Sequence, residues 1–285
     1  MDGGGSWQPD GGAALLEAKP FANPPTYLGS VNGGATCSQK YATIGHMPKG
    51  DSSARYPLFL YFVGTSVTAD DEGSRYDCKA ALAVTEAMAR RGFVALSAQY
   101  DNSLTFAFDN KLKCAYNNGD ADLLSIACAL PEVDCDKGIA TWGHSQGALA
   151  AHIAANFDPR VRAVWTTGYG GFDAAALPKN RLRVVNGAAD GMNADVATLN
   201  KTVGFSAAQC PNDGRTECLR ADGSGWVLVQ KADCQLTAAD HCWFDKINCL
   251  GNTETLEPNW VDPDSRAAFA LEVNADWVAA TVHRP

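Results

Sequence analysis

One serine stands between two glycines in residues 141–150, TWGHSQGALA. A run of strand character (GIATW) precedes the motif and a small-residue run of helix character (GALAAHIAANF) follows it. This strand, turn and helix context is the one that a G-x-S-x-G nucleophile elbow requires, because glycines two residues before and after the serine leave room for neighbouring backbone. Free N–H groups at the start of the helix, beginning with Gln146, would favour a developing oxyanion. We therefore predict that Ser145 is a catalytic nucleophile.

A serine hydroxyl needs a base to take its proton, and histidine is the usual base. The sequence has five histidines. His241 lies in the loop ADHCWF after the last expected strand, where the chain returns to the serine's edge of the sheet. His283 lies at the far end of the following helix, which rises about 1.5 Å per residue and carries it away from the site. We predict His241 as the base. Packing or surface roles are expected for the other three, His46, His144 and His152.

An acid is needed to orient the histidine and to fix its tautomer. The expected strand LRVV ends in NGAADG, which places Asp190 just past the carboxyl end of a strand, where α/β sheets hold functional groups. Asp195 fits the first turn of a helix, and Asp240 is too close along the chain to reach the far side of the His241 ring. Asp190 is therefore the predicted acid.

From residue 57 onward, apolar runs of strand length alternate with amphipathic segments of helix character. This alternation predicts an α/β fold, with a mostly parallel central sheet and helices on both faces. Strands are expected at 58–63, 93–98, 138–142, 163–167, 182–185 and 226–229. Helices are expected at 78–91, 121–130, 146–156, 193–208 and 265–282. Segments 27–31 and 40–44 predict an antiparallel edge. We expect an N-terminal extension over residues 1–25 and one catalytic domain over residues 26–285.

From about Tyr27 to the C-terminus the chain resembles the α/β-hydrolase superfamily. The stretch MARRGFVALSAQYD resembles the helix and strand of dienelactone-hydrolase-like and secreted esterase members, and VVNGAADGM resembles their acid turn. The chain order of Ser145, Asp190 and His241 matches the triad order of that fold. The resemblance thus implies an α/β-hydrolase fold that carries a Ser-His-Asp triad.

The resemblance also implies a second oxyanion donor, a backbone N–H just after the third strand. Here the matching donor is the Thr65 N–H, beside that of Gln146. The sequence has Val63 and Gly64 before it, where the common form of the family has His-Gly.

The implied activity is that of a secreted serine hydrolase that cleaves short-chain or polymeric carboxylic esters through an acyl-enzyme. A thioesterase or a serine peptidase would use the same residues. A non-catalytic binding protein of this fold is the alternative from another class, but such proteins commonly lose a triad member and all three are present here. No HExxH or similar histidine cluster occurs, so we expect neither a metal nor a cofactor.

Ten cysteines indicate the redox compartment of the protein, and a net charge of -9 limits the kinds of partner that it attracts. No CxxC pair occurs, so we predict disulfides in an oxidising compartment rather than a zinc site, with short loops at Cys128–Cys135 and Cys210–Cys218. Three cysteines between Cys234 and Cys249 predict a bridge that holds the His241 loop. The N-terminus as given lacks the features of a signal peptide. We expect a monomer with no nucleic-acid or membrane partner, since both attract basic proteins.

Access to the site is predicted from the length of the connections. Residues 168–181 are too short for a lid domain, and the longer insertion at 193–225 should form a small wall stapled by cysteines. An open cleft is therefore expected. Three aromatic residues near its rim, Tyr169, Trp226 and Trp243, fit either substrate contact or core packing equally well.

Overall fold

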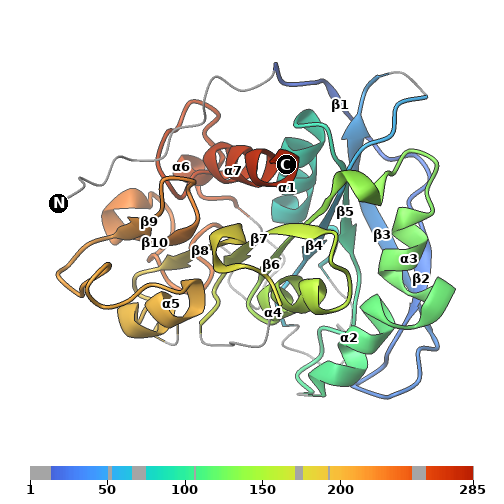
Figure 1. Cartoon of the computed structure of the whole chain (residues 1–285), viewed down its shortest axis with the longest axis horizontal. Coiled ribbons are helices and arrows are strands. Elements are labelled where there is room, and N and C mark those ends of the chain that lie inside the picture. Colours follow the sequence, from blue (N-terminus) through green and yellow to red (C-terminus); the bar gives the residue numbers. More distant parts are fainter. Residues whose placement is uncertain are drawn as a thin grey trace.

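The computed structural model describes residues 14–50, 53–65, 75–105, 107–170, 176–191, 193–245 and 255–284. Its centre is a 10-stranded sheet in the order β1-β3-β5-β4-β6-β7-β8-β10-β9, with β2 paired to β3 off this path (Figure 1). The strands are β1 Ala18–Pro20, β2 Thr26–Gly29, β3 Gln39–Pro48, β4 Leu58–Phe62, β5 Val94–Ala98, β6 Ile139–His144, β7 Val161–Thr167, β8 Leu182–Gly187, β9 Glu217–Leu219 and β10 Gly225–Val229.

The middle of the sheet, from β5 through β4, β6, β7 and β8 to β10, is parallel throughout. Only the edges are antiparallel, where β1 and β2 pair with β3, β3 pairs with β5, and β9 pairs with β10. The parallel strands are buried at nearly every position, as near-continuous apolar runs require when helices cover both faces. The expected α/β class and all six expected central strands are confirmed. Strand β1 lies within the predicted extension of residues 1–25, whose boundary stays a prediction.

Helices cover both faces of this sheet (Figure 1). They are α1 Lys79–Arg90, α2 Phe108–Tyr116, α3 Leu123–Cys128, α4 Gln146–Ile153, α5 Val196–Val203, α6 Pro258–Val261 and α7 Leu271–His283. α1 and α7 pack together on one face, where Arg91 forms ion pairs with Glu272 at 2.8 Å and Asp276 at 2.6 Å. α4 and α5 lie on the other face. α2 and α3 pack against β2.

Helices α5 and α7 are shorter than predicted, and α2 and α6 were not predicted. Helix α5 begins after Asp195, whose carboxylate accepts the Thr198 N–H, and ends at Gly204, which has a left-handed φ of 73°. Helix α7 begins at Leu271 rather than at residue 265. The sequence FDNKLKCAY of α2 gave no helix signal because its buried side includes a lysine, Lys111.

The chain changes direction across the sheet at β4. Strand β5 follows β4 along the chain and pairs on one side of it, whereas β6 pairs on its other side and the chain then continues through β7, β8 and β10. Such a switch leaves a crevice at the carboxyl ends of the two strands, because the connections leave toward opposite faces. Residues that follow Phe62 of β4 and His144 of β6 therefore lie at this crevice.

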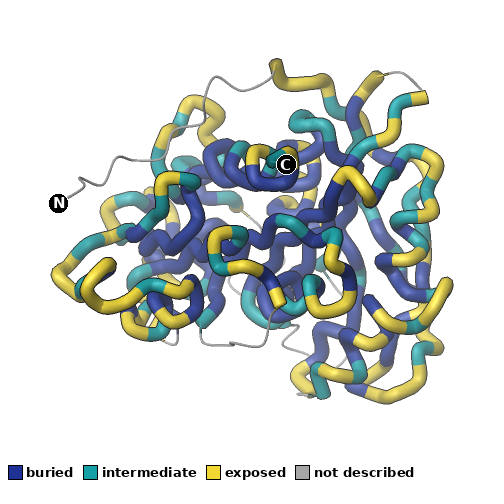
Figure 2. Tube along the Cα trace, in the orientation of Figure 1, coloured by how far each residue is buried: buried dark blue, intermediate teal, exposed yellow. Residues whose placement is uncertain are grey.

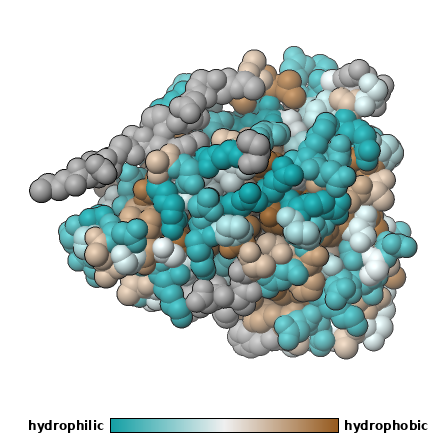
Figure 3. Space-filling model, viewed as in Figure 1, coloured by the Kyte–Doolittle hydropathy of each residue, from teal (hydrophilic) through white to brown (hydrophobic). Residues whose placement is uncertain are grey.

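The buried residues lie mainly in the central strands and in the adjoining parts of the helices, which are the dark segments of Figure 2. Six tryptophans are almost fully buried, and Trp142 of β6 stacks on Trp165 of β7 with ring centroids 4.4 Å apart. Figure 3 shows a mostly hydrophilic face with apolar side chains in small separate groups. In the part of the chain that the structure describes, no helix has the length and apolar character needed to cross a membrane.

Three disulfides link described residues: Cys37–Cys114, Cys128–Cys135 and Cys210–Cys218. The two short pairings predicted from spacing are confirmed. Cys249 lies outside the described residues, so the bridge predicted around His241 stays a prediction.

These disulfides predict the outcome of a thiol titration. Three bridges oxidise six of the ten cysteines, so the denatured, unreduced protein should present at most four thiols. Replacing Cys37 and Cys114 together by serine should lower the free energy of unfolding by about 4 kcal/mol, because their sequence separation of 77 closes a long loop. The same change at Cys210 and Cys218, separated by 8, should cost about 2.5 kcal/mol and serves as the control. Ten titratable thiols before reduction would contradict the bridges.

Candidate active site

Ser145 occupies the sharp turn between β6 and α4. Its φ of 55° and ψ of −120° lie in a sparsely populated region for a residue with a side chain. A Cβ added at Gly143 would lie 2.0 Å from the Gly147 oxygen, and one added at Gly147 would lie 2.1 Å from the Phe62 oxygen. Both positions therefore need glycine, and the predicted strand, turn and helix of an elbow are confirmed.

The predicted acid and base are in contact. His241 Nδ1 lies 2.7 Å from Asp190 Oδ2, and the same oxygen accepts a hydrogen bond from Asn193 Nδ2 at 2.9 Å. The Asp190 side chain is 2% exposed and that of His241 is 29% exposed. The two loops are also joined through their backbones, because the Ala189 N–H donates to the Ala239 oxygen at 2.9 Å. With Nδ1–H directed at the carboxylate, the imidazole keeps Nε2 as an acceptor.

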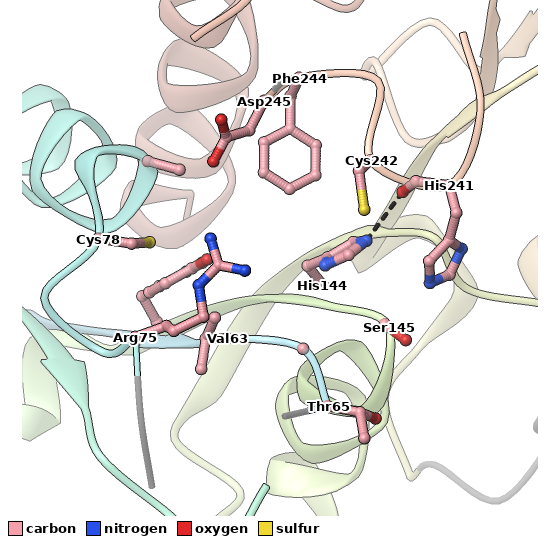
Figure 4. Close-up of a pocket in the computed structure, with 13 residues that line it drawn as sticks. Val63, Thr65, Arg75, Cys78, His144, Ser145, His241, Cys242, Phe244 and Asp245 are labelled. Carbon is pink, nitrogen blue, oxygen red and sulfur yellow. Dashed lines mark hydrogen bonds between the residues drawn. The ribbon is translucent and has the colours of Figure 1, made fainter. Parts of the chain in front are cut away.

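Ser145 and His241 line the same two cavities, together with Thr65. The larger cavity, of about 420 Å³, has a mainly apolar wall formed by Leu104, Phe108, Leu149 and Tyr169. The smaller cavity, of about 180 Å³, is drawn in Figure 4 and adds polar groups. Those polar groups belong to Tyr61, Arg75, Cys78 and Asp245. The serine thus lies where two differently lined spaces meet.

The two predicted oxyanion donors flank Ser145. Among the described residues, no hydrogen bond engages the backbone N–H of Thr65 or of Gln146. A Cβ added at Gly64 would lie 3.3 Å from Ser145 Cβ, so this backbone runs directly past the serine. The Asn102 amide donates to the Gly64 oxygen at 3.0 Å, and because that oxygen shares a planar peptide with the Thr65 N–H, the bond fixes the direction of the N–H.

His144 lies inside the site, a contact that its predicted packing or surface role did not include. Its Nε2–H donates to the His241 carbonyl oxygen at 2.8 Å, and the two rings lie 4.7 Å apart (Figure 4). Burial and, to a smaller extent, the neighbouring His241 together lower the pKa of His144 to about 3. His144 is therefore a neutral ring that ties the histidine loop to the elbow.

The other histidines lie away from the serine. His283 packs against Phe93, at the amino end of β5 and so at the opposite edge of the sheet. His46 bonds a threonine hydroxyl of α1 at 2.9 Å. His152 is buried in α4 and bonds the Tyr169 hydroxyl. The packing or surface roles predicted for His46 and His152 agree with these contacts, and His283 lies away from the serine as predicted.

The walls of the site agree in part with the prediction. Of the three rim aromatics, Tyr169 lines the larger cavity, whereas Trp226 and Trp243 are core residues at 0% and 1% exposure. Beyond the acid turn, the insertion forms α5, the Cys210–Cys218 bridge and β9. Of the described residues of this insertion only Asn193 lines a cavity at Ser145, so the predicted stapled wall stays a prediction. Between β7 and β8, the described residues 168–170 and 176–181 contain only a 3-10 turn and no lid domain.

Sequence reasoning missed Asn102, His144 and Asn193. Each acts through a bond to a segment distant in sequence or to a turn atom, and no local pattern marks such bonds. The one available signal was the position of His144 directly beside the serine.

The pKa of His144 predicts how stability depends on pH. In the unfolded chain its ring binds a proton near its ordinary pKa of 6.5, whereas the folded ring stays neutral down to about 3. Its contribution to stability is therefore complete above pH 6.5 and is lost as pH falls from 6.5 toward 3, by at most about 1.4 kcal/mol per pH unit. His144→Gln keeps an amide N–H for the His241 carbonyl and removes this titration, so urea unfolding between pH 7 and 4 should show a shallower loss. Equal slopes in both proteins would refute the assignment.

No protein-family model matches the chain, and none of the curated proteins matches it. It is similar to brefeldin A esterase, a bacterial homologue of human hormone sensitive lipase, at 14% identity over 54% of this chain and 40% of that one, with a TM-score of 0.36. A serine hydrolase without a lid from Xanthomonas campestris is 18% identical over 61% of this chain and 74% of that one, with a TM-score of 0.41. A hypothetical protein from Pseudomonas aeruginosa is 20% identical over 55% of this chain and 44% of that one, with a TM-score of 0.35. The chain thus spans less than half the length of two of these proteins. The strand order and the turn at Ser145 identify the α/β-hydrolase fold.

Proposed function

We propose that this protein is a serine hydrolase that cleaves carboxylic esters through an acyl-enzyme. In this proposal Ser145 is the nucleophile, His241 is the general base and Asp190 orients the base. The observation that carries it is the 2.7 Å contact between His241 Nδ1 and Asp190 Oδ2, at a cavity that Ser145 also lines. A carboxylate, an imidazole and a serine in an elbow are the parts that acyl transfer needs.

The chemistry follows from these groups. Ser145 Oγ attacks the ester carbonyl carbon while His241 Nε2 takes its proton, and the buried Asp190 carboxylate stabilises the imidazolium that forms. The backbone N–H groups of Gln146 and Thr65 donate to the oxyanion of the tetrahedral intermediate. The alcohol leaves with the proton held on His241. A water molecule, deprotonated by the same base, then hydrolyses the acyl-enzyme and restores the serine.

Two cavities that meet at the serine support an ester with two unequal parts. The larger cavity, with its wall of Leu104, Phe108, Leu149 and Tyr169, fits the larger apolar part, and the smaller cavity fits the other. The partial exposure of His241 supports a site that is open to soluble short-chain esters or to a polymer end. Three disulfides support an oxidising compartment, so the proposal includes a secreted or periplasmic protein. It also includes a monomer without a nucleic-acid or membrane partner.

The nucleophile can be tested by covalent labelling. A fluorophosphonate should label Ser145, and Ser145→Ala should abolish both labelling and hydrolysis of a nitrophenyl ester, because the mechanism rests on that hydroxyl. Ser206→Ala, at a serine bonded only within its own turn, is the matched control and should keep both. Mass spectrometry of the labelled peptide identifies the site. Activity retained in Ser145→Ala would reject the proposal.

The base can be tested by a pair of histidine substitutions. His241→Ala should lower kcat by roughly 10⁴-fold, since triad members act as a unit. His283→Ala should leave kcat near the wild-type value, because that ring lies against Phe93 at the other edge of the sheet. Steady-state kinetics on one soluble ester compares the two. A large loss of kcat in His283→Ala with none in His241→Ala would show that His241 is not the base.

A further inference from the structure

A lysine is buried next to the proposed oxyanion site. Lys111 of α2 is 3% exposed, and its ammonium group faces three oxygen atoms. They are the Ser103 carbonyl at 2.7 Å, Gln146 Oε1 at 3.1 Å and Asp101 Oδ1 at 3.5 Å. A lysine is rarely buried unless its charge and its three donors are matched, and here each donor has an oxygen to face.

The lysine determines which way the Gln146 amide points. An ammonium group only donates, so the amide must turn its oxygen toward Lys111 and its nitrogen away. Gln146 Nε2 then donates its two hydrogens to the Ser103 carbonyl at 3.0 Å and to Thr65 Oγ1 at 3.1 Å. The opposite orientation would set donor against donor at Lys111 and acceptor against acceptor at Ser103. The amide orientation is therefore fixed by its partners.

The same logic fixes the role of the Thr65 hydroxyl. Its oxygen accepts from Gln146, so its own hydrogen remains to be donated. Within the described part of the chain the Thr65 hydroxyl donates to no acceptor. Thr65 lines both cavities beside Ser145, and the adjoining Gly64 passes so close to the serine that a Cβ there would lie 3.3 Å from Ser145 Cβ.

We propose that Lys111, Gln146 and Thr65 form a one-directional hydrogen-bond relay that presents the Thr65 hydroxyl hydrogen to the carbonyl oxygen of the bound ester. Thr65 then donates twice, through its hydroxyl and its backbone N–H, and is a catalytic residue. Lys111 acts through Gln146 and is a positioning residue. This inference rests on the proposed ester hydrolysis.

The relay favours the transition state over the bound ester. The carbonyl oxygen gains negative charge as Ser145 adds to the carbon, and a donor already aimed at it strengthens its bond at that moment. A cation at the far end polarises each bond of the chain in the same direction. The Asp101 carboxylate balances the charge of the buried Lys111 ammonium group. It does not replace Gln146 as a partner of the lysine, so the relay keeps all its bonds.

The hydroxyl is tested at Thr65. Thr65→Val keeps the shape and the backbone N–H but removes the hydroxyl, so kcat on a soluble nitrophenyl ester should fall about 100-fold with little change in KM. Thr65→Ser restores a hydroxyl and should recover most of that loss. Thr43→Val is the matched control, because the Thr43 hydroxyl is buried on β3 and bonds the Pro25 oxygen, far from the cavities. It should keep the wild-type kcat.

The relay itself is tested by a double-mutant cycle. Lys111→Met should lower kcat about tenfold in the wild-type background and have less than about a twofold effect in Thr65→Val, because the hydroxyl it acts through is then absent. Gln146→Met breaks the same chain and leaves the pair of Lys111 with Asp101, so it replaces Lys111→Met if that variant does not fold. It should show the same dependence on Thr65.

The outcomes separate the two proposals. If the wild-type protein is labelled by a fluorophosphonate and active, but Thr65→Val keeps kcat within about threefold, the relay is refuted and the ester hydrolase stands. Equal losses from Lys111→Met or Gln146→Met in both Thr65 backgrounds would also refute it, since they indicate a structural role alone. A wild-type protein that is neither labelled nor active overturns the proposed function and the relay together.

Discussion

The hydrogen bond between His241 and Asp190 is the interaction on which the site depends. Asp190 is almost fully buried, and a buried carboxylate is costly unless its oxygens are hydrogen-bonded. Asn193 and His241 both donate to Oδ2 of this carboxylate. Removing the imidazole would leave the carboxylate poorly compensated, so folding itself holds the ring at the acid. The bond that the proposed chemistry needs therefore also stabilises the folded chain.

The loop that carries His241 has little regular structure, yet it is held firmly. The Glu257 carboxylate, at 0% exposure, accepts the backbone N–H groups of residues 235, 236 and 237 at 2.6, 2.9 and 3.2 Å. A Cβ at Gly187 would lie 2.1 Å from the Ala239 oxygen, so the end of β8 touches the loop directly. His144 holds the same loop from the elbow. The Glu257 carboxylate, the end of β8 and His144 thus hold this loop in place without the hydrogen bonds of a regular sheet.

The sequence predicts what depends on local pattern. The buried parallel strands are continuous apolar runs, and the elbow is a short motif in which two glycines are required by close backbone contacts. The contact of Asp190 with His241 follows from both residues lying past carboxyl strand ends. Helix α2 could not be predicted, because Lys111 on its buried side breaks the apolar pattern. The Cys37–Cys114 pairing could not be predicted either, because no spacing rule applies to a sequence separation of 77.

The edge hairpin takes part in the site through α2. The loop between β2 and β3 is tied to α2 by the Cys37–Cys114 bridge and by the Asn110 amide, which donates to the Gly33 oxygen at 2.7 Å. The same loop gives the Gly33 N–H to Asp101 Oδ2 at 2.7 Å. Asp101 in turn faces Lys111, one turn before Cys114 on the helix. The hairpin therefore fixes both the helix that holds the lysine and the carboxylate that balances its charge. A segment far from Ser145 in sequence thereby determines where a buried cation lies relative to the serine.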